Sequence, residues 1–190
     1  MSKPILTQAQ GMGLVALARM TLENVLADKN NDLTIFDLDP YKIERGVFVT
    51  LFSGTKLRGC IGNIEPEGTL FELAQKLAIA AATCDPRFKA VTAPELKNIE
   101  LEVSILSPTL ELIGKDSLEK TSQIRPFIDG IVIEKGSNKA TFLPQVWESL
   151  KTKEAFLGEL CKKACLEYDD WKTKETKIYS YQVQHFKEES

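Results

Sequence analysis

The chain has 190 residues, of which 43% are hydrophobic and 27% are charged. This is the length of one large domain or two small lobes with a core, and the composition excludes a disordered protein. The formal net charge of −3 and the isoelectric point near 5.4 argue against nucleic acid as a partner, because phosphate binding requires a basic surface.

No segment of the sequence predicts a secretory signal or a membrane span. The longest apolar stretch, residues 77–83, is too short to cross a bilayer. The four cysteines form no Cys-x-x-Cys pair, which is typical of reduced thiols in a cytosolic protein. We expect a cytoplasmic protein that contacts no membrane.

The first third of the chain predicts one helix and one β-hairpin. Residues 7–29 repeat apolar side chains at helical spacing. Residues 47–53 and 57–62 are extended runs on either side of Gly54, which indicates a hairpin.

The next segments predict a buried helix and a strand. Thr69 and Glu72 have the spacing of a capping box, so a helix is expected from there to about Thr83. Pro86 ends it, because the residue before a proline disfavours helical geometry. Residues 99–107 alternate between apolar and polar side chains and predict a half-buried strand.

The last third of the chain predicts a second hairpin followed by helices. Residues 130–134 and 139–143 form the expected hairpin, and Pro144 begins a short helix. A further helix is expected over residues 154–166 and one closing strand over residues 178–186. The order of hairpin, proline and helix thus occurs twice, which suggests two related lobes.

Residues 57–62, Leu-Arg-Gly-Cys-Ile-Gly, carry the most unusual chemistry. Arg58 and Cys60 should leave an extended strand on the same face, where a guanidinium would lower the pKa of a thiol. Gly59 and Gly62 would let a ligand or another backbone approach. The motif predicts either a nucleophilic Cys60 or an anion site at Arg58. In the packing alternative, Cys60 is buried, Arg58 pairs with a carboxylate and the glycines serve a tight crossing.

Other polar residues are candidates for the same site. Asp85 and Arg87 either line one cleft with the cysteine or pair with each other to hold their turn while Phe88 fills the core. Glu65, in the turn after the motif, is a further candidate acid. A cysteine nucleophile normally needs a histidine base, and nothing in the sequence brings the single histidine, His185, to the motif. Whether the two meet is left open.

No pattern predicts a metal or cofactor. Cys161 and Cys165 share a helix face but lack the further ligands that zinc requires, and they are interpreted as core residues. No P-loop, dinucleotide fingerprint or iron–sulfur spacing is present. We therefore expect neither a metal nor a cofactor.

The sequence resembles the AMMECR domain family, and it is most similar to the prokaryotic branch called AmmeMemoRadiSam system protein A. The matching segments cover nearly the whole chain and are residues 57–62, 85–88, 101–108, 140–147 and 156–166, with Trp171. Two positions depart from the family pattern. Cys165 stands where relatives usually have glycine, and Phe127 follows Pro126 where glycine is common. Both are interpreted as local backbone changes.

The resemblance implies an α+β fold of two interlocked lobes, each a β-hairpin or antiparallel sheet with packed helices. A single domain is expected over residues 5–186, with a larger lobe containing residues 41–110 and a smaller lobe around residues 125–170. The family name records neighbourhoods shared with a Memo-like protein and a radical S-adenosylmethionine (SAM) protein. The resemblance therefore implies these two as partners, but it implies no activity.

Three functions follow from these observations. The favoured one is a cytosolic ligand-binding or accessory component that holds a small anionic or polar ligand through Arg58, Gly59, Gly62, Glu65, Asp85 and Arg87. The alternative is a cofactor-independent enzyme that uses Cys60 as a nucleophile beside Arg58. The third is an interaction domain without a small-molecule site.

Overall fold

The computed structural model describes residues 4–188. The chain divides into two compact units, of which the first comprises the residues up to Leu106 and those from Gln184 onward. The second unit is Ser107–Val183. Each unit is a sheet with packed helices, so the predicted α+β class is confirmed. Within residues 4–188, none of the helices combines the length and apolar character needed to cross a bilayer.

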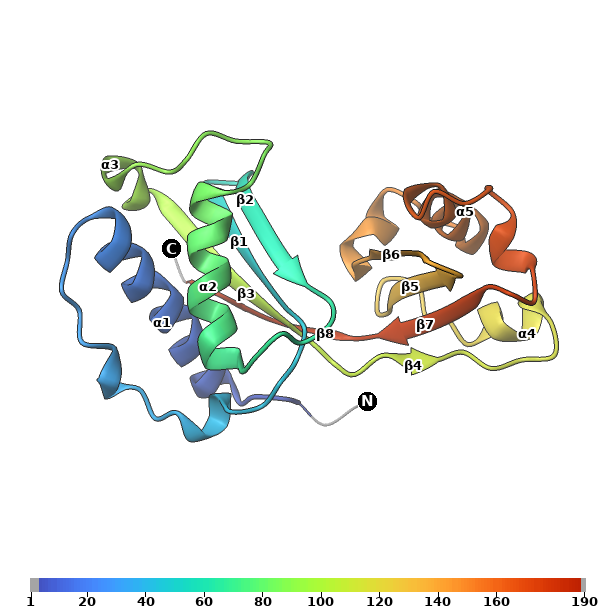
Figure 1. Ribbon diagram of the computed structural model, residues 1–190, viewed down its shortest axis with the longest axis horizontal. Helices are drawn as coiled ribbons and strands as arrows, with labels where there is room; N and C mark the ends of the chain where they lie inside the picture. Colours follow the sequence, from blue (N-terminus) through green and yellow to red (C-terminus); the bar gives the residue numbers. More distant parts are fainter. Residues whose placement is uncertain (1–3, 189–190) are drawn as a thin grey trace. The chain divides into compact units, whose positions relative to one another are not determined.

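The first unit is a four-stranded sheet in the order β2-β1-β3-β8, with α1 and α2 packed on one face (Figure 1). Its elements are α1 (Gln8–Leu26), η1 (Leu33–Ile35), η2 (Asp39–Tyr41), β1 (Val47–Ser53), β2 (Lys56–Asn63), α2 (Leu70–Thr83), α3 (Ala93–Leu96), β3 (Ile99–Leu106) and β8 (Val183–Lys187). The predicted hairpin, buried helix and strand are confirmed as β1–β2, α2 and β3, but β3 is mostly buried and not half-buried as expected.

Capping boxes set the starts of both long helices. The Thr69 hydroxyl accepts a hydrogen bond from the Glu72 backbone N–H, and the Glu72 carboxylate accepts one from the Thr69 N–H. Thr7 and Gln10 make the same reciprocal pair at the start of α1. Because each pair satisfies two backbone donors that the first turn leaves free, the helices begin at these residues.

Side-chain alternation gives the sheet of the first unit two different faces. Leu51 on β1 and Leu101 on β3 are fully buried against the helices. The neighbouring residues Thr50 and Glu102 form a cross-strand pair, and their side chains point to the opposite face of the sheet. We call this the helix-distal face, and it carries the residues Phe48, Thr50, Cys60, Glu102, Ser104 and His185.

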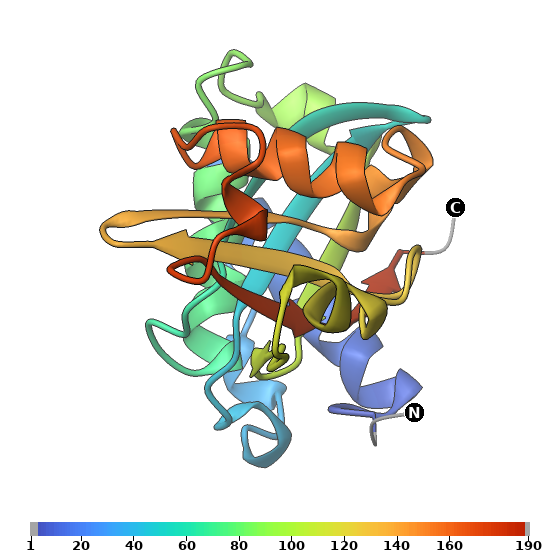
Figure 2. The ribbon, with the colours of Figure 1, turned by 90° about the vertical axis from the view of Figure 1, so that its right-hand side faces the viewer.

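The second unit is a four-stranded sheet in the order β4-β7-β5-β6, and α5 lies over the β5–β6 hairpin (Figure 2). Its elements are β4 (Leu110–Glu111), α4 (Ser117–Ser122), β5 (Gly130–Lys135), β6 (Asn138–Phe142), η3 (Pro144–Glu148), α5 (Lys153–Lys163), η4 (Asp170–Lys172) and β7 (Lys177–Tyr181). The second predicted hairpin and the short helix at Pro144 are thereby confirmed.

The core of the second unit is built on aromatic stacking. Trp147 stacks on Phe156 with their ring centroids 3.7 Å apart, and its indole N–H donates to the backbone oxygen of Asp129. Cys161 is fully buried in this core, as expected, whereas Cys165 is exposed and the core interpretation was wrong for it. The helix ends at Lys163, before the predicted residue 166, because Cys165 adopts a left-handed φ of 57°.

The prediction of one closing strand over residues 178–186 was wrong. The segment forms two strands, β7 and β8, which belong to different sheets. The break lies at Gln182, whose backbone exchanges two hydrogen bonds with Ser107: the Gln182 N–H donates to the Ser107 hydroxyl, and the Ser107 N–H donates to the Gln182 oxygen. A side-chain oxygen thus takes the place of a ladder partner, and alternation along the sequence does not reveal that change.

Candidate functional site

The Leu57–Gly62 motif lies on β2, which is an edge strand of its sheet. Leu51 pairs with Gly59 and Phe52 pairs with Leu57, so Arg58 is an extra residue in a β-bulge. A bulge re-aims the side chain that it carries. The regular alternation that predicted Arg58 and Cys60 on one face is therefore interrupted between them.

Arg58 is held by a carboxylate that the sequence analysis did not identify. Its Nε and Nη2 atoms donate to the two carboxylate oxygens of Glu95, at 2.5 and 3.1 Å. The guanidinium also lies over the ring of Phe88, with 5.9 Å between its central carbon and the ring centroid. Its third nitrogen, Nη1, is buried and has no hydrogen-bond partner within residues 4–188. One strong donor is therefore left unsatisfied in this part of the first unit.

Cys60 is half-buried, and the Thr50 hydroxyl donates a hydrogen bond to its sulfur at 3.3 Å. Burial raises the pKa of the Cys60 thiol, and the Thr50 hydrogen bond and the charge of Arg87 oppose this rise only in part. The predicted lowering of this pKa by Arg58 was wrong. The physical reason is that the bulge and the ion pair with Glu95 hold the Arg58 charge elsewhere, while the sulfur loses contact with water.

Asp85 and Arg87 meet Cys60 at the sheet edge. The buried carboxylate of Asp85 accepts a 2.8 Å hydrogen bond from the Cys60 N–H and two from the Arg87 guanidinium, at 3.0 and 2.7 Å. Arg87 Nη2 also lies 3.4 Å from the Cys60 carbonyl oxygen. These hydrogen bonds, those from Arg87 first, hold the pKa of Asp85 well below its usual range against the opposing effect of burial. The loop thereby satisfies backbone groups that an edge strand leaves unpaired.

The Arg87 side chain is 54% exposed, although its partner Asp85 is buried. Its guanidinium lies 5.4 Å from the centroid of the Phe88 ring. Phe88 itself is half-buried and contacts both arginines, so the expectation that it fills the core was wrong. The structure thus presents a cation at the surface in a fixed position beside Cys60.

Close packing accounts for both motif glycines. A Cβ atom on Gly59 would lie 2.2 Å from the backbone oxygen of Ala81 in α2. A Cβ atom on Gly62 would lie 2.3 Å from the Phe48 ring. Their predicted role in letting a ligand approach stays a prediction.

His185 lies on β8 and does not contact Cys60. Its Nδ1 atom is 3.0 Å from the Ser104 hydroxyl oxygen and 3.4 Å from a carboxylate oxygen of Glu102. Strands β1 and β3 separate β8 from β2, which corresponds to about 14 Å at the usual strand spacing. The open question about these two residues is therefore answered: His185 is too far away to take a proton directly from the thiol.

Glu65, the last candidate from the sequence, is exposed in the connection between β2 and α2. Sequence reasoning missed Thr50, Glu95 and Glu102 around the motif. Thr50 and Glu102 follow Cys60 in one row across three strands. Glu95 occupies the third helical position of a Thr-x-x-Glu capping box at α3. This pattern indicates a helix start, so it gives no sign that Glu95 also binds Arg58.

The residues available for a metal ion are few. Over residues 4–188 no group of three or more histidine, cysteine, aspartate or glutamate side chains is arranged to hold one. The cysteines are free thiols, of which Cys84 and Cys165 are exposed. The polar groups of the motif region are two paired guanidinium groups, the Cys60 thiol and hydrogen-bonding oxygens.

Comparison with known proteins places this fold in a family. The AMMECR1 family model matches residues 15–186. The chain belongs to the AMMECR1 family. A protein of Methanothermobacter thermautotrophicus is 40% identical to this AMMECR1 chain, with 97% of each chain covered. Protein MJ0810 of Methanocaldococcus jannaschii is also 40% identical, over 97% of this chain and 92% of its own.

A solved structure supports the same AMMECR1 fold. The crystal structure of protein PH0010 from Pyrococcus horikoshii matches with a TM-score of 0.85 and 36% sequence identity. The match covers 98% of this chain and 95% of that one. The family resemblance and the fold class inferred from the sequence are both confirmed.

Proposed function

We propose that this AMMECR1 protein is a binding or accessory component that holds a small polar ligand beside Cys60. The observation that carries the proposal is the Arg87 guanidinium, which is more than half exposed yet fixed by two hydrogen bonds to buried Asp85. A cation held in one orientation loses little conformational freedom when it binds a ligand oxygen. The unsatisfied Nη1 atom of Arg58 is a second donor in the same unit.

The charges favour a polar ligand over a small anion. Arg58 is neutralised by Glu95, and Arg87 is neutralised by Asp85. Glu102 adds a further carboxylate, and its electrostatic effect reaches the thiol. Because the region carries no surplus positive charge, a free anion gains little from entering it. A ligand with a neutral acceptor oxygen meets donors without this opposition.

The alternative of an enzyme with a Cys60 nucleophile is disfavoured by the thiol itself. Nucleophilic attack needs the thiolate, and burial raises the Cys60 pKa. Alkylation with iodoacetamide at about pH 7 should therefore modify exposed Cys84 and Cys165 before Cys60, and the Cys60 rate should rise only above the ordinary thiol pKa of about 8.5. Mass spectrometry of peptides measures each rate. Modification of Cys60 first at neutral pH would favour the enzyme instead.

Mass spectrometry of small molecules released by denaturing the purified protein tests ligand binding. A compound should be released at a constant ratio to wild-type protein, and its amount should fall in Arg87→Gln. The matched control is Arg125→Gln, because Arg125 in the second unit is also half exposed and grips a buried aspartate, Asp129. Equal release from both variants, or no released compound, would contradict the proposal.

We also propose that the protein acts together with a Memo-like protein and a radical SAM protein, as the resemblance of its sequence implies. Purified partners from the same genome should form a complex with the chain in size-exclusion chromatography. Surface charge reversal at an exposed lysine outside the motif strand, such as Lys151→Glu, serves as the control variant. Failure of both partners to co-elute over a range of concentrations would contradict this part.

A further inference from the structure

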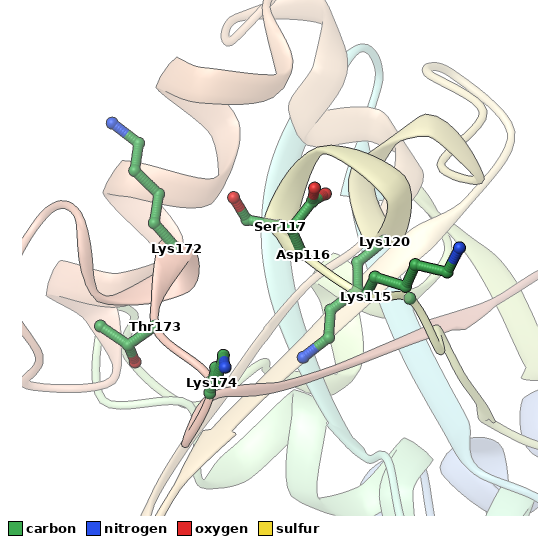
Figure 3. A pocket seen from close by; sticks show the side chains of 8 residues that line it. Lys115, Asp116, Ser117, Lys120, Lys172, Thr173 and Lys174 are labelled. Carbon is green, nitrogen blue, oxygen red and sulfur yellow. The ribbon is translucent and has the colours of Figure 1, made fainter.

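The second unit contains a basic pocket that is separate from the motif residues. It has a volume of about 410 Å³ and is lined by α4, the residues before it, and the segment at residues 172–174. The lining residues are Gly114, Lys115, Asp116, Ser117, Lys120, Lys172, Thr173 and Lys174 (Figure 3). Four lysines and one aspartate give the lining a formal charge of +3, whereas the whole chain carries −3.

Three of these lysines have no carboxylate partner within residues 4–188. Lys115 and Lys174 are exposed and form no ion pair within the described residues. Lys120 extends from α4 toward the 172–174 segment, as Figure 3 shows, and its ammonium donates to the backbone oxygen of Thr176 at 3.2 Å. Only Lys172 is neutralised, by Asp169 at 2.6 Å. The positive charge of the pocket is therefore largely unbalanced by its own side chains.

Three acidic groups near the pocket have other partners. Asp116 caps α4 by accepting a hydrogen bond from the Glu119 N–H at 2.8 Å. The Glu119 carboxylate accepts one from the backbone N–H of Lys115, also at 2.8 Å. Asp170 is held by Lys135 at 2.6 Å, outside the pocket lining. These carboxylates are fixed by helix capping and by a strand lysine, so they do not close over the pocket ammonium groups.

We infer that this pocket binds a small phosphorylated molecule. A phosphate ester carries about two negative charges and several acceptor oxygens. Such a ligand can bind several unpaired ammonium groups at once, whereas a ligand with a single carboxylate carries only one negative charge. Lysine ammonium groups act as mobile point charges and suit phosphates in several orientations. The volume lies within the range of small-molecule sites, about 300–1,000 Å³. Ser117, whose hydroxyl has no hydrogen-bond partner in the part of the chain that the structure describes, is a further donor.

Isothermal titration calorimetry with pyrophosphate tests the site. Wild-type protein should bind one equivalent, and the double variant Lys115→Gln/Lys174→Gln should bind at least about tenfold more weakly, because it loses two charge-assisted contacts. The matched control is Lys151→Gln, which removes an exposed lysine of the same unit outside the pocket. It should bind like wild type. All three substituted side chains are exposed, and circular dichroism checks that each variant is folded.

Three outcomes would overturn the inference. One is the absence of saturable heat up to about 10 mM pyrophosphate, well above the range of a millimolar site. The second is an equal loss of affinity in Lys151→Gln, which would indicate non-specific attraction. The third outcome concerns a lipid surface, because exposed Ile113 and Leu118 lie next to the pocket lining in sequence. If the protein binds phosphatidylcholine vesicles that contain phosphatidic acid, and pyrophosphate does not displace it from them, the partner is a lipid surface and not a small molecule.

Discussion

Both units contain a buried aspartate held by a half-exposed arginine, but the two aspartates differ in how far along the chain their hydrogen-bond partners lie. In the second unit, Asp129 accepts hydrogen bonds from the backbone N–H, Nε and Nη2 of Arg125, which is four residues away. In the first unit, Asp85 is gripped by Arg87 in a similar way, and it also accepts the N–H of Cys60, 25 residues earlier. The first pair therefore joins a loop to a sheet edge, while the second closes a single turn.

A second difference lies in how cations are used. The arginines around the motif are paired with carboxylates, so their charge builds structure. The lysines of the basic pocket are largely unpaired, so their charge remains available to a ligand. A cation that belongs to a recognisable motif is thus not necessarily more available to a ligand than a cation outside any motif.

The largest expected effect on stability comes from replacing the two buried aspartates, Asp85 and Asp129. Asp85→Ala should lower the free energy of unfolding by about 3 kcal/mol, because it removes a buried carboxylate that accepts hydrogen bonds from Arg87 and leaves the Cys60 N–H without a partner. Asp129→Ala should cost about 1 kcal/mol less, since only local bonds are lost. Urea denaturation measures both. Equal costs would show that the long-range bond contributes nothing.

Part of the Asp85 contribution should depend on pH. Its pKa in the folded protein lies well below the unfolded value of about 3.9, so the stabilisation is complete above about pH 5, begins to decrease as the pH falls through the unfolded value, and is fully lost only below the pKa of the folded state. The difference in unfolding free energy between wild type and Asp85→Ala should therefore shrink from about pH 6 to about pH 3. A difference that stays constant over this range would contradict the assignment.

Replacement of a glycine by alanine should also change the stability of the protein by different amounts in the two units. Gly59→Ala should cost about 2 kcal/mol or more, because the new methyl group meets the rigid backbone oxygen of Ala81. In Gly158→Ala, on α5, the methyl group would meet the Tyr168 ring, which is 38% exposed and can rotate away. Helix propensity favours that change by up to about 1 kcal/mol, so its net cost should be small. Thermal unfolding compares the two, and a larger cost at Gly158 would oppose this reasoning.

The smallest expected effect is a gain in stability. Cys165, after α5, and Asp28, after α1, adopt left-handed φ angles of 57° and 51°. Cys165→Gly should stabilise the protein by about 1 kcal/mol, because glycine adopts this geometry without a steric cost. Asp28→Gly should gain less, since aspartate tolerates the left-handed region better than most residues. Cys165→Ala is the control and should give no gain, and chemical denaturation distinguishes the three variants.

Most of the secondary structure was predictable because its signals are local. The capping box at Thr69 and Glu72 begins α2, and the glycine turns mark both hairpins. The departures from the family pattern at Phe127 and Cys165 coincide with positive φ angles, so a substitution of glycine correctly indicated unusual backbone. The short elements α3, α4 and β4 were missed, because two to six residues give no readable period.

The candidate site was predictable only in part. The sequence brought Asp85 and Arg87 into the same hypothesis as Cys60, and the structure does join them at the sheet edge. It could not reveal the bulge at Arg58 or the partner Glu95, because one extra residue in a strand changes a side chain's direction without changing its local pattern.

By itself, the sequence determined the family, the α+β class and the positions of the long helices and hairpins. Residues a few positions apart decide the helices and hairpins through capping, periodicity and turn geometry, whereas the family and the fold class followed from the resemblance of the motif segments. The tertiary structure alone decided that burial raises the pKa of the Cys60 thiol, that Asp85 accepts a hydrogen bond from the Cys60 backbone and that lysines from two distant segments line one pocket. Each of these depends on burial and on contacts across the fold, which spacing along the chain does not specify.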